Sequence, residues 1–217
     1  MNLRRLPLIP TILVIAAVAT MIGLGLWQIS RAGEKRDLIA LYRANPAKPA
    51  LMFPLLGPVP PAAVFRRSTV QCIEVVGWRT ELGAAFDGTP GYRQIAQCRT
   101  GAEGPGALVD MGVPSATNLA LDPNYRPRWA GGEARGIIST EPDHRSLLSR
   151  LFGRDKVLLP MLVSSQPAPG LRPSARPNPE SVPNNHLFYA GQWFFFAAAA
   201  SVIYVLALRK RLRGEVA

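Results

Sequence analysis

The chain has few of the residues that build metal centres and covalent catalysts. Only two histidines and two cysteines occur in 217 residues, so the chain cannot assemble a multi-histidine metal centre. Cys72 and Cys98 are too far apart to form a CxxC metal site, the cysteine pair of a copper-delivery domain or a CxxCH haem attachment. Motifs of the types GxSxG and HExxH and phosphate-binding glycine loops are also missing. We therefore expect neither a hydrolase nor a nucleotide-driven enzyme, and no catalytic residues.

Acidic residues are scarce as well. The chain has 14 Asp and Glu against 25 Lys and Arg, which gives a net charge of +11. Such an excess can neutralise the phosphates of nucleic acids. Here, however, the basic residues are mixed with acidic ones and form no basic stripe with interleaved aromatics. We expect no nucleic-acid partner and assign the excess to solvated faces and to the anionic headgroups of a lipid bilayer.

Two long runs without charged residues are present, at residues 6–30 and 187–208. A membrane-spanning helix needs about 20 apolar residues, and both runs reach that length. The first is about twice as long as the apolar region of a signal peptide, so we interpret it as an uncleaved anchor. The second opens with aromatic residues typical of a membrane interface. The predicted order is a tail (1–7), a transmembrane helix (8–29), a central domain (30–186), a second transmembrane helix (187–208) and a basic tail (209–217).

The distribution of basic residues predicts the orientation of the two spans. Four basic residues in segment 209–213 favour a cytoplasmic C-terminus. Because the number of spans is even, the N-terminus is then cytoplasmic too. Segment 31–48 carries more basic residues than segment 1–7, which points the other way, although long loops are translocated largely regardless of charge. We favour two cytoplasmic tails.

Small residues recur four positions apart in both runs. Ala19 and Gly23 form such a pair in the first, and Ala197 and Ser201 form one in the second. This spacing predicts close packing of the two helices against each other or against a partner.

The central domain begins with a helix and continues with short apolar segments. Leu38, Leu41 and Tyr42 share one helical face, so the first helix should continue until Pro46. Beyond a proline-rich stretch, β-branched and apolar residues predict strands near 69–78, 91–99, 107–113, 134–140 and 156–164. The fold class is therefore a membrane α+β protein, with an antiparallel sheet or small barrel between the two terminal helices. We also predict a short helix over 146–152 and an extended connector over 166–183.

The two cysteines lie on neighbouring predicted strands. A cross-strand disulfide forms if the domain faces an oxidising compartment, and two buried free thiols are the alternative.

The two histidines differ in their settings. His144 follows a turn signal among charged residues and is interpreted as a solvated loop residue. His186 immediately precedes the aromatic second span, where Asn184 or Asn185 can cap the helix. One interpretation is an interfacial histidine that hydrogen-bonds headgroups or helix ends. The other is an axial ligand of haem iron, with the porphyrin packed against Phe188, Tyr189 and Trp193.

Two segments at the membrane ends resemble a known family. The stretch 183–194, PNNHLFYAGQWF, is similar to the C-terminal signature of the surfeit locus protein 1 family, and 24–31, LGLWQISR, with Lys35, is similar to its N-terminal one. The resemblance implies a helix at each end and a β-rich domain on the periplasmic side of a bacterial inner membrane. It also implies a role in assembling cytochrome c oxidase and in handling haem a for the catalytic subunit.

The resemblance assigns roles residue by residue. His186 matches the histidine proposed to contact haem iron, and Tyr189, Ala190 and Trp193 match the aromatic helix start beside it. The residues that match the N-terminal signature are Gly25, Trp27, Gln28 and Arg31. In the middle of the chain, 109–114 reads VDMGVP where the family usually shows a Val-Asn-Arg-Gly-Trp strand end. Whatever contact that arginine and tryptophan make, with a haem propionate or the oxidase, is therefore absent here.

The implied function is an assembly factor that holds haem a transiently and passes it to the oxidase catalytic subunit, with the haem a synthesis enzyme as a second partner. A carrier must bind weakly, since a site that outcompeted the oxidase would block transfer. The alternative is a membrane-tethered scaffold that binds the oxidase subunit or the synthesis enzyme through its helices and sheet edge and holds no cofactor.

Overall fold

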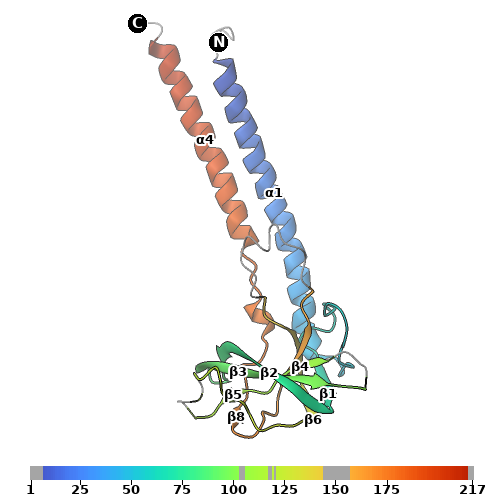
Figure 1. Ribbon diagram of the computed structural model, residues 1–217. Helices are drawn as coiled ribbons and strands as arrows, with labels where there is room; N and C mark the ends of the chain where they lie inside the picture. Colours follow the sequence, from blue (N-terminus) through green and yellow to red (C-terminus); the bar gives the residue numbers. More distant parts are fainter. Residues whose placement is uncertain (1–6, 103–105, 117–118, 120, 144–156, 215–217) are drawn as a thin grey trace. The chain divides into compact units, whose positions relative to one another are not determined.

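The computed structural model describes residues 7–102, 106–116, 119, 121–143 and 157–214. The chain divides into two compact units. The helical unit comprises Met1–Leu38 and Val182–Ala217, and the β unit comprises Ile39–Ser181. Figure 1 shows the elements in chain order: α1 (Leu8–Ala44), η2 (Asn45–Ala47), β1 (Arg67–Cys72), β2 (Glu74–Ala84), β3 (Pro90–Arg99), β4 (Ala107–Asp110), β5 (Val113–Pro114), β6 (Gly132–Thr140), β7 (Pro160–Ser164), β8 (Leu171–Arg172), η3 (Pro179–Ser181) and α4 (His186–Gly214).

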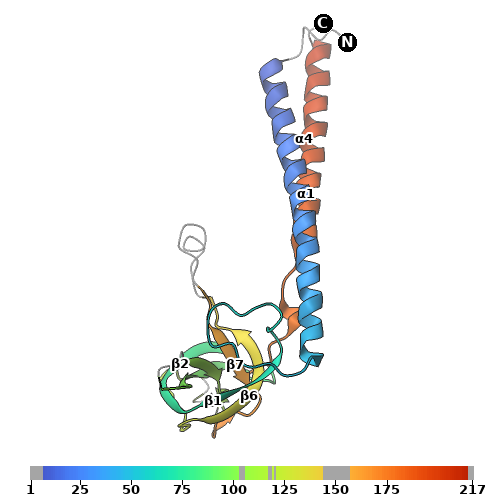
Figure 2. The same cartoon turned by 90° about the vertical axis from the view of Figure 1, so that its right-hand side faces the viewer.

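Two apolar helices form the helical unit. Both α1 and α4 are long and apolar enough to cross a membrane, and most of their large hydrophobic side chains are exposed. They lie side by side, with the beginning of α1 and the end of α4 at the same end of the pair (Figures 1 and 2). Exposed apolar helices of this length indicate a membrane protein, as the sequence predicts.

The first helix continues past its apolar run, as predicted. α1 ends at Ala44, and Pro46 lies in the 3₁₀ turn η2 that follows. The side chain of Asn45 is fully buried there, and its amide donates to the carbonyl oxygens of Pro61 and Val64 at 3.0 and 2.9 Å. Pro46 cannot continue the helix because it has no N–H to donate.

A six-stranded sheet forms the β unit, with strand order β1-β6-β7-β4-β3-β2. Neighbouring strands are antiparallel except β4 and β7, which are parallel. The sheet is therefore mostly antiparallel, as predicted, and mixed at this one pair. A parallel pair needs a long crossover, and the chain between β4 and β7 includes β5 and β6.

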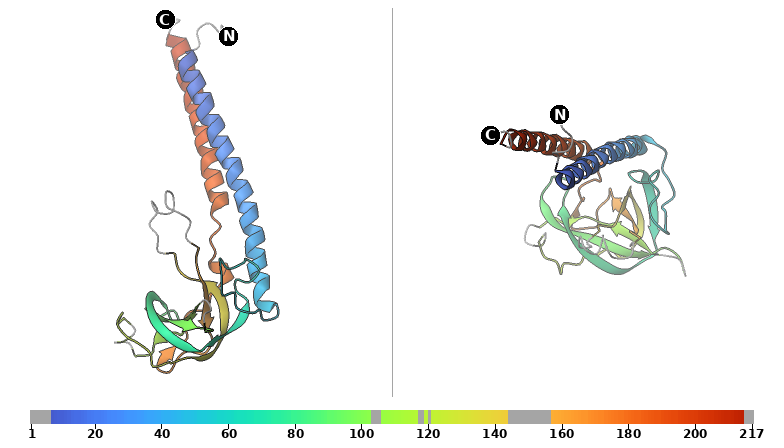
Figure 3. Two further views of the ribbon diagram at one scale, coloured as in Figure 1. Left: turned by 45° about the vertical axis from the view of Figure 1, so that its right-hand side comes forward. Right: turned by 90° about the horizontal axis from the view of Figure 1, so that it is seen from above.

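The sheet curls so that its two edge strands approach each other where the chain passes from one to the other. β1 and β2 lie at opposite ends of the strand order, yet only Ile73 separates them in the chain. The Ile73 N–H donates to the carbonyl of Arg99 in β3 at 2.8 Å, which holds the junction of β1 and β2 to β3. Figure 3 shows the curled sheet from two sides. A curled, mostly antiparallel sheet agrees with the predicted fold class.

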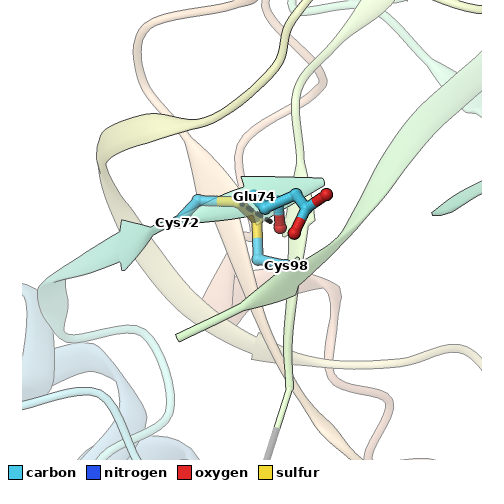
Figure 4. The surroundings of a disulfide bond; sticks show 3 residues. All are labelled: Cys72, Glu74 and Cys98. Atoms are coloured by element: carbon cyan, nitrogen blue, oxygen red, sulfur yellow. Dashed lines mark hydrogen bonds between the residues drawn. A yellow bond between two sulfur atoms is a disulfide. The ribbon is translucent and has the colours of Figure 1, made fainter. Parts of the chain in front are cut away.

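A disulfide joins Cys72 at the end of β1 to Cys98 in β3 (Figure 4). Both side chains are buried, and they pack in a cluster that includes Val70, Val109 and Ile138. The choice between a disulfide and two free thiols, which the sequence left open, is thereby decided. The covalent bond joins the edge strand β1 to β3, the neighbour of the other edge strand.

Two predicted segments are built differently. Residues 69–78 do not form one strand, because the chain changes from β1 to β2 at Ile73. Residues 166–183 are not a loose connector: this segment contains β8, and Ala168, Leu171 and Ser174 in it are buried. A proline carbonyl can still accept hydrogen bonds, so a proline-rich segment can pair at a sheet edge, and the Pro173 oxygen accepts from the Phe86 N–H at 2.9 Å. The predicted helix 146–152 and His144 lie outside the described residues.

Candidate functional site

Residues spaced three or four positions apart form the seam between α1 and α4. This spacing is typical of left-handed helix pairs, in which side chains of one helix fill the gaps of the other. Buried or half-buried side chains in α1 include Thr11, Val14, Val18, Met21, Gly25, Gln28 and Ala32. In α4 they include His186, Ala190, Trp193, Ala197, Ser201, Tyr204 and Leu208.

Gly25 of α1 lies directly against the Phe194 ring of α4. A Cβ atom at Gly25 would lie 2.6 Å from the ring of Phe194, whereas one at Gly23 would meet nothing within 4 Å. The predicted small-residue pair Ala19 and Gly23 is exposed, so it does not pack against α4. The pair on α4 does lie in the seam, with Ala197 buried. Spacing alone could not show which glycine of α1 faces the partner helix.

Polar contacts join the two predicted signatures. The His186 Nδ1 lies 2.7 Å from Gln28 Oε1. Two residues earlier, the amide of Asn184 donates to the backbone oxygen of Ala32 at 3.2 Å. The segment that enters α4 is thus held to α1 at two points one helical turn apart. Asn184 therefore ties the chain to α1, and Asn185, which is exposed, holds the position just before the first helical residue.

The predicted aromatic residues differ in exposure. Trp27 and Tyr189 are 53% and 47% exposed, while Trp193 is half-buried in the seam. Ala190 is buried against α1, which explains why a small residue stands between two aromatics. A shallow, mainly apolar depression of about 450 Å³ lies on α4, lined by Leu187, Phe188, Gly191, Gln192 and Phe195. An apolar surface of this kind suits a flat hydrophobic ligand or lipid.

Arg31 takes no part in the contact around His186. Its guanidinium pairs with Glu34 at 2.5 Å on the exposed surface of α1. Arg31 therefore belongs to an exposed ion pair within α1 and makes no contact with the residues that join the two signatures.

The far end of the helix pair carries a contact that the sequence analysis missed. The hydroxyls of Thr11 and Tyr204 are hydrogen-bonded to each other. Polar residues within apolar spans usually face a partner helix. The two hydroxyl-bearing residues within the apolar runs could therefore have predicted this contact. Phe194, which fills the space above Gly25, could not be distinguished from the neighbouring phenylalanines by sequence.

The divergent segment 109–114 lies in the core of the β unit. Asp110 is fully buried, and its carboxylate accepts from Arg93 Nη1 at 3.2 Å, the Ser174 hydroxyl at 2.6 Å and the Gly112 N–H at 3.1 Å. Burial raises the pKa of Asp110, while the Arg93 charge and the hydrogen bonds oppose that rise. This segment therefore joins β3, β4 and the proline-rich segment in the fold.

Within the described residues, no three histidine, cysteine or acidic side chains lie close enough to hold a metal ion. His186 can thus supply one ligand to a metal that brings its other ligands with it, as a porphyrin does.

Comparison with known proteins agrees with the resemblance noted in the sequence. The family model described as SURF1 family matches residues 15–198, which include both signatures and the whole β unit. No curated protein matches the chain.

Proposed function

The chain belongs to the SURF1 family, which is associated with cytochrome c oxidase assembly, and we propose that it serves this assembly by holding haem a transiently at His186. The observation that carries the proposal is the 2.7 Å contact between His186 and Gln28. It joins the N- and C-terminal signatures at one point, so both signatures contribute to one site.

The chemistry of His186 fits an axial ligand. Its imidazole is half-buried and tied through Nδ1, which leaves Nε2 as the nitrogen for iron. A histidine ligand usually donates its other N–H to an oxygen acceptor, which fixes the ring. The exposed faces of Phe188 and Tyr189 offer apolar surface to the macrocycle. A single histidine ligand suits cargo that has to leave again.

The disulfide supports a periplasmic β unit. Disulfides persist in oxidising compartments and are rare in the cytosol, and Cys72 is bonded to Cys98. Together with the basic C-terminal tail, this favours a protein of the bacterial inner membrane with both termini in the cytoplasm. The haem would then be held near the outer surface of the membrane, where α4 begins.

The partners follow from this role. The oxidase catalytic subunit receives the haem, and the haem a synthesis enzyme supplies it. The protein itself performs no covalent chemistry in this scheme. It binds, orients and releases the haem.

An optical spectrum of the detergent-purified protein tests the proposal. The protein is co-expressed with the host's haem a synthesis enzymes as the native chain, as His186→Ala and as His144→Ala, which removes the other histidine and serves as the matched control. We expect the Soret and α bands of haem a in the native and His144→Ala proteins, and their loss or shift in His186→Ala.

A native protein that purifies without haem a, yet still retains the oxidase catalytic subunit, would contradict the haem-holding role. That result would favour the cofactor-free scaffold instead.

A further inference from the structure

We propose that Gln28 is a positioning residue that fixes the tautomer of His186, with the proton on Nδ1 and the lone pair on Nε2. The inference deepens the proposed function. It rests on that function only where the Nε2 lone pair is said to bind haem iron. The tautomer itself is a property of the protein alone.

The hydrogen bond determines which ring nitrogen carries the proton. Gln28 Oε1 is an amide oxygen, which can accept a hydrogen bond but cannot donate one. At 2.7 Å from this oxygen, His186 Nδ1 must be the donor. In a neutral imidazole the other nitrogen then carries the lone pair. A solvated histidine favours the opposite tautomer, with the proton on Nε2, so the contact changes the preferred state.

The backbone around the contact is held independently of the two side chains. The Asn184 amide donates to the Ala32 carbonyl, one turn beyond Gln28 in α1. On the other side, the Phe194 ring lies against Gly25, about one turn before Gln28. These contacts hold the start of α4 against this part of α1. Gln28 therefore meets the imidazole in a fixed place, and no flexible loop intervenes.

The arrangement has a consequence for metal binding. Iron binds through the unprotonated nitrogen, and a ligand that is already in the right tautomer loses no free energy in changing it. Removing the oxygen partner of a ligating histidine typically lowers metal affinity by about 10- to 100-fold. Gln28→Ala should do so, whereas Gln28→Glu, which retains an oxygen acceptor, should not.

Nitrogen NMR of the haem-free protein tests the tautomer directly. The full chain carries His144→Gln, so that ¹⁵N-labelled histidine reports only His186, and it is recorded in detergent at a pH where the ring is neutral. We expect a pyrrole-like Nδ1 and a pyridine-like Nε2 in the native chain, a shift towards the Nε2–H tautomer in Gln28→Ala, and recovery in Gln28→Glu. Gln71→Ala, which truncates an exposed glutamine of β1, is the matched control and should resemble the native chain.

Two results would overturn the inference. The first is an Nε2–H tautomer in the native chain, which would mean that the Gln28 amide presents its NH₂ group to Nδ1. The second is a spectrum that Gln28→Ala leaves unchanged.

A haem titration of the same variants separates this inference from the proposed function. With haem a as the probe, Gln28→Ala should bind about 10- to 100-fold more weakly than the native chain. Haem bound to Gln28→Glu should have a lower reduction potential than haem bound to the native chain, because a carboxylate partner makes the histidine ligand more basic. Equal affinity and equal spectra for native and Gln28→Ala would overturn the positioning role. If the native chain binds no haem at all, the proposed function fails, and the NMR result still decides the role of Gln28.

Discussion

Removing the disulfide should cost the β unit about 3.5 kcal/mol of unfolding free energy. The bond closes a loop with a sequence separation of 26, and the chain-entropy relation for a loop of that size gives about 3.5 kcal/mol at 25 °C. The change is Cys72→Ala with Cys98→Ala. Alanine is chosen because both sites are buried, and serine would bury an unpaired hydroxyl.

Urea unfolding of the full-length protein in detergent measures this cost. Trp78 and Trp129 pack against the core of the β unit, so a background with Trp27→Phe and Trp193→Phe makes fluorescence report that unit. With a urea slope of about 2 kcal/mol/M, the midpoint should fall by about 1.8 M. Reductant should lower the midpoint of the cysteine-containing chain only. Coinciding midpoints for the two chains without reductant would refute the reasoning, because the bond would then not constrain the unfolded state.

Three further changes test other contacts. Gly25→Ala places a Cβ against the Phe194 ring and should cost the helix pair about 1–3 kcal/mol, measured by SDS titration with a fluorophore pair at the two chain ends. Tyr204→Phe removes the hydroxyl that bonds to Thr11 and should cost about 0.6 kcal/mol in the same assay. Asp110→Asn should flatten the pH dependence of stability: since burial raises the pKa of Asp110 above its ordinary 3.8, ionisation destabilises the native fold as pH rises from about 4 through the raised value, and urea midpoints between pH 4 and 8 report this.

Each of these changes has its own control. Gly23→Ala adds the same methyl group at an open position, and an equal loss there would mean that the cost is not one of packing against α4. A Tyr204→Phe protein as stable as the native one would show that the hydroxyl pair contributes nothing. Parallel pH curves for Asp110 and its Asn variant would contradict the raised pKa.

Helices α1 and α4 could be predicted from the sequence because each is marked by a local signal. The length of the apolar runs and the proline at position 46 define α1 and its end at Ala44. The strands around 91–99 and 134–140 were also found, since β-branched runs between glycines and prolines are local too. The parallel pair β4 and β7 was not found, because strand partners far apart in sequence leave no local trace. The packing of residues 166–183 against the β unit was not predicted either, because their proline content suggested a linker.

The candidate site was predicted as two separate signatures, and the sequence could not pair their members. His186 and Gln28 are 158 residues apart, and only the packing of α1 against α4 brings them together. The choice of Gly25 over Gly23 as the contact glycine depends on the rotation of α1 about its axis. Rotation follows from the summed fit of many side chains, which no single motif records.

The position of the disulfide also allows the β unit to assemble in chain order, because the protein is synthesised from its N-terminus onwards. β1, β2, β3 and β4 come first, and Cys72 can join Cys98 while β6 and β7 are still to come. Because β6 and β7 lie between β1 and β4 in the sheet, the bond would hold β1 near β3 and leave a gap between β1 and β4 for the two late strands. The late strands need only fill that gap. Long-range pairing is the slow part of β-sheet formation, and forming this one disulfide first would bring β1 and β3 together before that pairing begins.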